Sequence, residues 1–451
     1  MISNLSREVT RLVEHSLKAI TTAKREGWWR VNEMATIRYK IDNFRYDPIV
    51  GNAQYGTSLE VSNMRSLDQG TKERLFDIIK LDTAFGEVRE QIDRIKGFRG
   101  KQGEVWLITF LTRIANESTD SELSLVDVSH IIQAFLNDVS DGPVDWTITS
   151  YLSGLVVKDG SINLDDKTIL RQVTQDDLEK EINRHPGTPY GRSFLDNATA
   201  VLEIHTLEGI HPMIYPAINV YLLLFLLFGN GSVNHIRTQW KGESILRYPG
   251  EFGGGPMFVG FPNEKYVLRK EDLGQFKRFA DVLKDKLPID SNGQVESDHH
   301  IGISIARYQD AILRNEVFVN RISYAVMGME ALYLKPNEVG ELNLRLSQRV
   351  AKLIAEVEQD NIFEIYKTMN RAYEIRSRFV HGSVQDGNTS DHKQVMEKLL
   401  KYLRKSIILF IMLSPDKKKE IILNTLDNAV LDHKITKKFN ASARLFREIF
   451  L

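Results

Sequence analysis

The end of one predicted helix carries two side chains that can do chemistry. Residues 373–382 read YEIRSRFVHG, in which Arg376 and His381 stand five positions apart and Gly382 closes the stretch. Glycine commonly follows the last turn of a helix, so His381 is expected at the carboxyl end, where exposed carbonyls and the helix dipole favour a protonated imidazole. We therefore expect His381 to act as a proton donor near neutral pH, beside the permanent positive charge of Arg376.

The helix that must position this pair is predicted over residues 361–380. Arg376 continues its apolar stripe by one turn, so this charge does not lie on the solvated face. Five positions along a regular helix rotate two side chains about 140° apart. Arg376 and His381 can therefore meet only because they stand at a helix end, where the last turn loosens. The apolar stripe consists of Ile365, Met369, Ala372 and Tyr373.

Two structural explanations for the same residues remain open. A histidine at a helix C-terminus can simply stabilise the end of the helix. Glu330 lies on an apolar stripe of another predicted helix, and a buried carboxylate favours a charged partner. Arg376 and Glu330 are therefore also candidates for an ion pair without a catalytic role.

The composition describes an ordinary globular protein without cysteine. A length of 451 residues suggests about three domains, and 42% hydrophobic with 26% charged residues excludes a disordered chain. The formal net charge is −1, so any nucleic-acid binding must come from a local basic patch. The lack of cysteine excludes disulfides and thiolate nucleophiles, and no secretory signal is apparent. We expect a cytoplasmic protein.

Hydrophobic periodicity and breaker residues divide the chain into three parts. Residues 1–142 are predicted as a helical domain of unknown role, with helices at 6–24, 72–95, 104–114 and 126–139. The breaker cluster SDGPVD leads into an α/β domain over residues 143–269. We expect there short strands within 146–169, a helix from the capping-box-like Thr174 to Ile182, a strand at 198–205, an apolar helix at 217–228, and strand character at 232–248 and 256–261.

The last part, residues 270–451, is predicted as a helical bundle. Its helices are expected at 273–287, 300–315, 318–333, 344–357, 361–380, 397–413 and 417–430. The fold class is therefore mostly α with a central α/β segment. The most apolar run, residues 217–228, is shorter than the roughly 20 residues that span a bilayer, so no membrane association is expected.

Two further clusters have both a functional and a structural explanation. Asp298, His299 and His300 could bind a metal, but no third ligand follows at helical spacing, so an aspartate cap with solvent-facing histidines explains them better. We predict no metal site. Between Lys393 and Lys419 eight basic residues accompany two acidic ones. This segment is either a path for RNA or the solvated face of a helix.

The C-terminal motifs resemble a known family. R-S-R-F-V-H, from Arg376 to His381, resembles the R-x4-6-H motif of HEPN domains. The fuller pattern resembles the Apea-like branch of that family, found in prokaryotic defence and toxin-type proteins. The resemblance covers about residues 270–419 and implies a C-terminal HEPN-type helical bundle. Its segments are ISIARY at 303–308, GMEALY at 328–333, QRVAK at 348–352 and YEIRSRFVHG at 373–382.

The resemblance implies a metal-independent endoribonuclease that uses the 2′-OH of RNA and needs no cofactor. Carried over by position, Arg376 would hold the scissile phosphate and His381 would be the general acid or base. The corresponding helices of two subunits would face each other across one composite site in a homodimer. Arg378 would contact backbone phosphate. The supporting residues would be Glu330, Tyr373, Asn370 and Ser377.

A non-catalytic function remains the alternative. An HEPN-like scaffold would use the same groove to bind RNA, a nucleotide or a partner protein. The two functions differ in whether RNA is cut or only bound.

Overall fold

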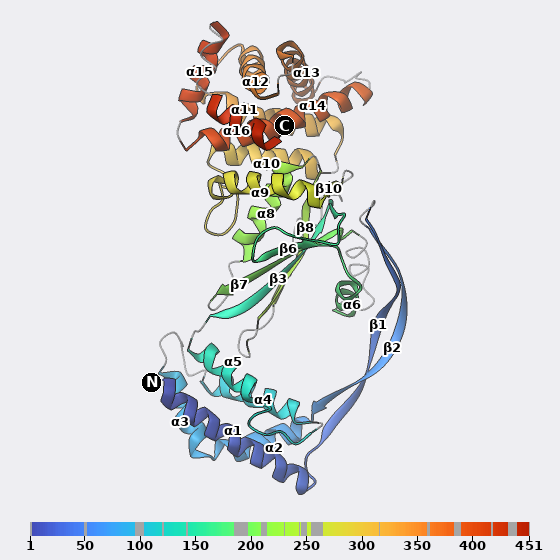
Figure 1. Cartoon of the computed structure of the whole chain (residues 1–451), viewed down its shortest axis with the longest axis vertical. Coiled ribbons are helices and arrows are strands. Elements are labelled where there is room, and N and C mark those ends of the chain that lie inside the picture. Colours follow the sequence, from blue (N-terminus) through green and yellow to red (C-terminus); the bar gives the residue numbers. More distant parts are fainter. Residues whose placement is uncertain are drawn as a thin grey trace.

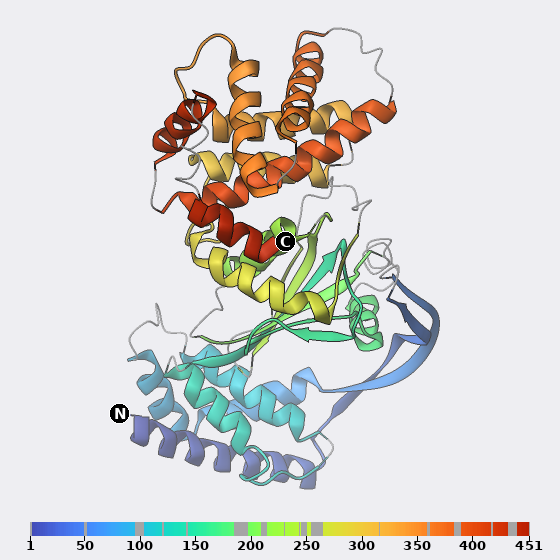
Figure 2. The ribbon, with the colours of Figure 1, turned by 45° about the horizontal axis from the view of Figure 1, so that its top comes forward.

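Helices lie at both ends of the molecule, and a β-sheet lies between them (Figure 1 and Figure 2). The fold is mostly helical with a central α/β part, as the sequence predicts. This computed structural model describes residues 2–48, 52–94, 103–119, 121–140, 143–184, 197–208, 214–229, 231–242, 244, 250–253, 265–314, 316–358, 361–382, 389–415, 418–431 and 440–450.

The amino-terminal helices form a core of their own. They are α1 (Ile2–Arg25), α2 (Gln69–Lys80), α3 (Thr83–Asp93), α4 (Gly103–Glu117) and α5 (Ser129–Val139). Phe110 and Phe135 stack inside this core with ring centroids 4.1 Å apart. The single helix expected over 72–95 is wrong, because the Asp82 carboxylate accepts a hydrogen bond from the Ala84 N–H at 2.8 Å and starts a second helix.

A long two-stranded ribbon leaves these helices, and the prediction of a helical domain over residues 1–142 did not include it. Strands β1 (Val31–Asp47) and β2 (Asn52–Leu67) pair antiparallel. The ribbon curves from the amino-terminal helices to α6 (Gln175–Arg184) beside the sheet (Figure 1). There Asn183 Nδ2 donates to the Tyr39 carbonyl at 2.8 Å, and the Ile41 N–H donates to Glu179 Oε1 at 3.0 Å. Side chains of α6 thus anchor the ribbon.

The central sheet has six strands in the order β5-β6-β7-β3-β8-β9, and each neighbouring pair is antiparallel. The strands are β3 (Val144–Ser153), β5 (Ser161–Asn163), β6 (Thr168–Arg171), β7 (Ala200–Glu208), β8 (Asn234–Gly242) and β9 (Gly250–Gly253). Outside this sheet, β4 (Leu155–Val157) pairs in parallel with β10 (Tyr266–Leu268). The predicted capping box of α6 is present, since the Thr174 N–H donates to Asp177 Oδ2 at 2.8 Å and the Asp177 N–H donates to Thr174 Oγ1 at 3.3 Å. The expected strand at 256–261 lies outside the described residues.

The C-terminal helices follow the predicted pattern, except that the helix expected at 397–413 begins at Thr389. The helix expected at 318–333 has these bounds in the structure, whereas the last helix of the chain was not predicted. The apolar helix expected at 217–228 is α8 (Ile214–Phe228). The C-terminal helices are α9 (Leu273–Leu283), α10 (His300–Leu313), α11 (Phe318–Tyr333), α12 (Leu342–Glu358), α13 (Ile362–Val380), α14 (Thr389–Leu413), α15 (Lys419–Leu431) and α16 (Asn440–Phe450).

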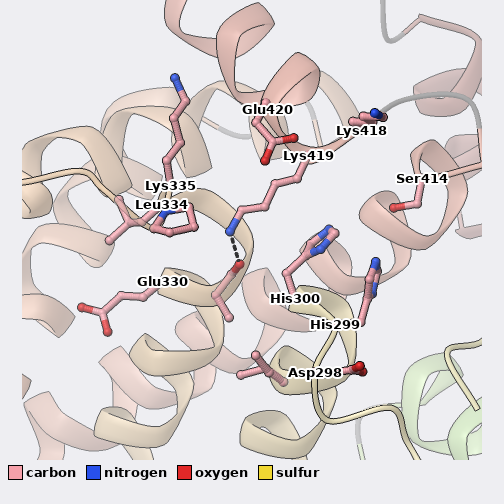
Figure 3. A pocket seen from close by; sticks show the side chains of 13 residues that line it. Asp298, His299, His300, Glu330, Leu334, Lys335, Ser414, Lys418, Lys419 and Glu420 are labelled. Atoms are coloured by element: carbon pink, nitrogen blue, oxygen red, sulfur yellow. Dashed lines mark hydrogen bonds between the residues drawn. The ribbon is translucent and has the colours of Figure 1, made fainter.

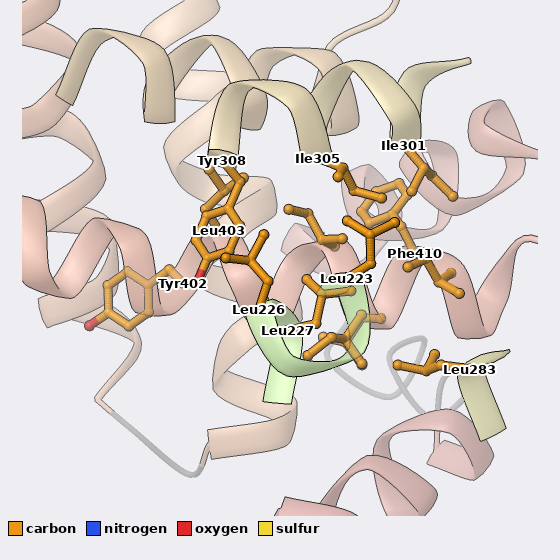
Figure 4. Packing of buried hydrophobic residues seen from close by; sticks show 14 of the residues in the cluster. Leu223, Leu226, Leu227, Leu283, Ile301, Ile305, Tyr308, Tyr402, Leu403 and Phe410 are labelled. Atoms are coloured by element: carbon orange, nitrogen blue, oxygen red, sulfur yellow. The ribbon is translucent and has the colours of Figure 1, made fainter. Parts of the chain in front are cut away.

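One hydrophobic core joins the sheet, α8 and the C-terminal helices. Leu226 and Leu227 of α8 pack with apolar side chains of α10 and α14 (Figure 4). Arg404 of α14 adds a polar link, because its Nη1 donates to the Phe228 carbonyl at the end of α8 at 2.9 Å. The sheet and the helical bundle therefore pack together, and the domain division at residue 269 stays a prediction.

Candidate active site at the end of α13

The helix that carries the predicted pair is α13. Asn361 caps its start by accepting a hydrogen bond from the Phe363 N–H at 2.9 Å. After its last residue, Val380, Gly382 adopts a φ of 68°, a left-handed conformation that favours glycine. The buried face of α13 holds Ile365, Thr368, Met369, Ala372 and Ile375. The helix is thus fixed in the core up to Ile375, and the residues that follow turn toward solvent.

Arg376 lies where α13 leaves the core, and its ion pair is loose. Its Nη2 atom is 3.5 Å from Oε2 of Glu330 on α11, which is long for a hydrogen bond. The side chains of Arg376 and Glu330 are 26% and 21% exposed. The guanidinium carbon is 5.9 Å from the ring centroid of Tyr373, and the buried Nε atom has no hydrogen-bond partner. The guanidinium has five donors, so it keeps capacity for another anion.

The electrostatics of Glu330 also indicate a weak pair. Burial raises the pKa of the Glu330 carboxyl, and the charge of Arg376 lowers it only in part. The ionised carboxylate is therefore less favourable in the folded protein than in the unfolded chain. An ion pair built for stability would have the opposite effect on this pKa.

The Glu330→Gln variant is expected to raise the midpoint of thermal unfolding at pH 7. Because folding raises the pKa of Glu330, ionisation of this carboxyl costs stability above its ordinary pKa, and glutamine avoids that cost. The gain should shrink as the pH falls toward about 4, where the carboxyl becomes protonated. Calorimetric midpoints between pH 4 and pH 7 measure the difference. Glu364→Gln, at a 55% exposed position on α13, is the control. A lower midpoint for Glu330→Gln at pH 7 would favour the purely structural ion pair.

His381 is exposed at the carboxyl end of α13. Its backbone N–H donates to the Ser377 carbonyl at 3.1 Å, so its backbone still follows the last turn while the residue is open to solvent. Phe379 and Val380 beside it are 44% and 60% exposed. This helix end therefore carries an imidazole and an apolar surface open to solvent, five residues after Arg376.

The other predicted residues have different surroundings. Ser377 is half-buried and Arg378 is exposed on the last turn of α13. Tyr373 is half-buried, and its burial raises the pKa of its hydroxyl. Asn370 instead accepts a hydrogen bond from Nδ2 of Asn343 on α12 at 2.6 Å. The structure thus places Tyr373, Ser377 and Arg378 near the helix end, and ties Asn370 to the neighbouring helix.

Arg349 of α12 belongs to a buried ion network, and it is not open to a substrate. Its side chain is 1% exposed. It donates to both carboxylate oxygens of Glu338 at 2.6 and 2.7 Å, to both of Asp427 at 2.6 and 2.8 Å, and to the Tyr333 carbonyl at 2.6 Å. Hydrogen bonding by Arg349 lowers the pKa of Glu338 to about 2. This network connects the end of α11, which carries Glu330, to α12 and α15.

The basic segment is divided between surface and core. Lys393, Lys398 and Lys401 are exposed on α14, as expected for a solvated helix face. Arg404 and Lys405 are only 7% exposed, and Arg404 binds the end of α8. Lys417 lies outside the described residues, and the described basic side chains of this segment do not form a continuous path.

A cleft of about 690 Å³ opens between the start of α10, the end of α11 and the start of α15 (Figure 3). We call it the α10–α15 cleft. His299 is the N-cap of α10 without a side-chain capping bond, and both His299 and His300 are half-buried. The expected aspartate cap with solvent-facing histidines is therefore wrong. Across the described ranges, no three or more His, Cys, Asp or Glu side chains are grouped so that they could hold a metal ion. The lining residues are Asp298, His299, His300, Ile303, Glu330, Ala331, Leu334, Lys335, Pro336, Ser414, Lys418, Lys419 and Glu420.

Comparisons with known proteins do not assign the chain to a family. No protein-family model, no curated protein and no solved structure matches it. In the part of the chain that the structure describes, none of the helices combines the length and the apolar character needed to cross a bilayer. The resemblance to HEPN domains thus rests on the motifs and on the residues at the end of α13.

Proposed function

We propose that this protein is a metal-independent endoribonuclease of HEPN type, active as a homodimer in a prokaryotic defence or toxin system. The observation that best supports this proposal is the arrangement of Arg376 and His381 at the end of α13. Arg376 has a 3.5 Å contact to Glu330 and access to solvent, and His381 is exposed five residues later. A permanent cation and an imidazole at one accessible helix end are the groups that RNA cleavage needs.

The proposed reaction uses a cation for the phosphate and a path for two protons. Arg376 binds the non-bridging phosphate oxygens and stabilises the negative charge that grows on them. A neutral imidazole takes the proton from the 2′-OH as the 2′-oxygen attacks phosphorus. A protonated imidazole gives a proton to the 5′-oxygen as the P–O5′ bond breaks. The products are a 2′,3′-cyclic phosphate and a 5′-OH end, and the nucleophile comes from the substrate itself.

A homodimer supplies the two imidazoles in one site. Each chain carries one His381, so two α13 ends that face each other offer one base and one acid. The exposed Phe379 and Val380 flank His381 and provide apolar surface for such a contact.

Cleavage of labelled RNA in EDTA tests this function. The purified full chain is expected to produce fragments that end in a 2′,3′-cyclic phosphate. A single 2′-deoxy nucleotide at the cut position should block cleavage there, and DNA of the same sequence should stay intact. Cleavage of the DNA, or RNA fragments that end in a 3′-OH, would contradict the mechanism. A strictly monomeric mass in light scattering at high protein concentration would contradict the composite site.

One observation favours the second candidate, a non-catalytic HEPN-like scaffold. Arg376 does have a carboxylate neighbour, Glu330, and the side chain of Glu330 is only 21% exposed. Such a scaffold would bind RNA, a nucleotide or a protein and leave RNA intact. Retained RNA binding without cleavage in the wild-type protein would support it.

A further inference from the structure

The α10–α15 cleft contains ring nitrogens without protein partners. His299 Nδ1 and His300 Nε2 are buried and make no hydrogen bond. The two rings lie 4.2 Å apart between centroids, and burial is the main cause that lowers the pKa of His300 to about 4. A buried polar atom without a hydrogen bond is costly. Both residues line the cleft, so these unpaired nitrogens lie just behind its surface, where a rotation of the ring brings them within reach of a ligand.

Lys419 places a positive charge on the same wall. Its Nζ donates to the Ala331 carbonyl at 2.6 Å, which uses one of the three ammonium donors (Figure 3). Burial lowers the pKa of Lys419, so the charged form is incompletely compensated. Ser414 and the exposed Lys418 also line the cleft and add further donors.

The acidic residues of the cleft do not neutralise this group of donors. Glu420 favours the charged form of Lys419, but the pKa of Lys419 remains lowered. The carboxylates of Glu330 and Asp298 point away from Lys419 in Figure 3. Among the carboxylates that line the cleft, only Glu420 therefore offsets the charge of Lys419.

A second cavity, of about 500 Å³ beside the sheet, does not show this property. The Tyr221 hydroxyl there donates to the Asp165 carboxylate. The His205 ring contacts Glu203 at 3.1 Å and Thr147 at 3.3 Å. Tyr221 and His205 are thus already paired, and they offer less to a ligand than the side chains of the α10–α15 cleft.

We propose that the α10–α15 cleft binds a phosphate monoester, whose oxygens accept hydrogen bonds from Lys419, from the imidazole N–H groups of His299 and His300, and from Ser414. A phosphate monoester carries nearly two negative charges at pH 7 and three strong acceptor oxygens, which suits this cluster of donors. The cleft volume of about 690 Å³ is within the usual range for small-molecule sites and leaves space for an attached nucleoside. A free nucleotide and the 5′ end of an RNA both carry this group.

Calorimetric titration of the full chain tests the proposal. The probes are inorganic phosphate, AMP against adenosine, and a short RNA with a 5′-phosphate against the same RNA with a 5′-OH. The phosphate-bearing probes are expected to bind and their unphosphorylated partners to bind more weakly or not at all. Lys419→Gln and His300→Asn should each weaken binding about tenfold or more. Lys277→Gln removes an exposed lysine of α9 outside the cleft and should leave the affinity unchanged.

The outcomes separate the two sources of phosphate and the two proposals. Binding of AMP identifies a nucleotide site, and binding of the 5′-phosphorylated RNA alone identifies an RNA-end site. Equal binding of AMP and adenosine, or unchanged affinity in His300→Asn, overturns the proposal. The wild-type circular dichroism spectrum must be retained in each variant, and His300→Asn decides if Lys419→Gln does not fold. The titrations are repeated in Arg376→Ala, so that they do not depend on RNA cleavage.

Discussion

Replacing Arg376 with alanine is expected to slow RNA cleavage by about 10²–10³-fold, the usual effect of removing one group that stabilises transition-state charge. The guanidinium of Arg376 lies at the solvent-facing end of α13 and has only a 3.5 Å contact to Glu330. Alanine leaves the growing charge on the phosphate without its cation. Single-turnover rates with saturating enzyme measure the loss in the chemical step.

Arg378→Ala is the matched control for this variant. Arg378 is exposed two residues further along α13, and by its predicted role it contacts backbone phosphate. Removal of Arg378 should weaken RNA binding and make that binding less dependent on salt. The single-turnover rate of cleavage in the bound complex should stay close to that of the wild type. Equal single-turnover rates in Arg376→Ala and the wild-type protein would exclude a catalytic role for Arg376.

His381→Ala should lower the same rate by about 10²–10⁴-fold, because it removes the proton carrier. When two groups act in the same catalytic step, the rate losses of their single variants do not add up in the double variant. The double variant of Arg376 and His381 is therefore expected to be little slower than the worse single variant. Full additivity of the two losses would contradict a single site.

The Arg349→Met variant is expected to lower the free energy of unfolding by about 3–5 kcal/mol, the usual cost of breaking a buried ion pair by removing one partner. Arg349 is 1% exposed, and each of its five donor positions makes a hydrogen bond. Methionine fills similar space but leaves Glu338, which is 10% exposed, without its main partner. Urea denaturation followed by circular dichroism measures the loss.

The pH dependence of stability gives an independent measure of this network. Hydrogen bonding by Arg349 lowers the pKa of folded Glu338 to about 2. Its contribution is therefore fully present above the ordinary glutamate pKa of about 4.3 and is lost as the pH falls toward 2. In Arg349→Met this part of the acid dependence should be absent.

Arg345→Met is the control, because Arg345 is 45% exposed and its contact to Glu338 is 3.5 Å long. That variant should change the free energy of unfolding by less than about 1 kcal/mol. A similar loss in both variants would contradict a special role for Arg349.

The sequence predicted best the elements that local signals define. The bounds of α11 and the terminal glycine of α13 follow from helical periodicity and from the residue type at the helix end. The split between α2 and α3 was missed, because the apolar pattern continues past Asp82 and hides its capping role.

The ribbon was missed for a different reason. Ile37, Tyr39 and Ile41 alternate as in a strand, but Ile37 is 61% exposed and Ile41 is 1% exposed. No continuous buried face marks the strand, since its anchor, α6, lies more than a hundred residues further along the chain. A two-stranded ribbon depends on such distant contacts for its stability.

The candidate sites were predictable to different degrees. Arg376 and its neighbour Glu330 could be proposed, because each charge interrupts an apolar stripe. The α10–α15 cleft could not, because it joins segments near residues 298, 335 and 419 that only tertiary packing brings together. Its imidazoles looked like solvent-facing groups at a helix start when considered alone.

Glu330 lines the α10–α15 cleft and is also the acidic neighbour of Arg376. One carboxylate is therefore common to both places. A ligand that displaced this side chain from the cleft would change how available the Arg376 guanidinium is to bind RNA. Because thermodynamic linkage is reciprocal, RNA held by the guanidinium would in turn change the affinity of the cleft for its ligand. If both proposals hold, this shared side chain would couple the two binding events through a change of one glutamate rotamer.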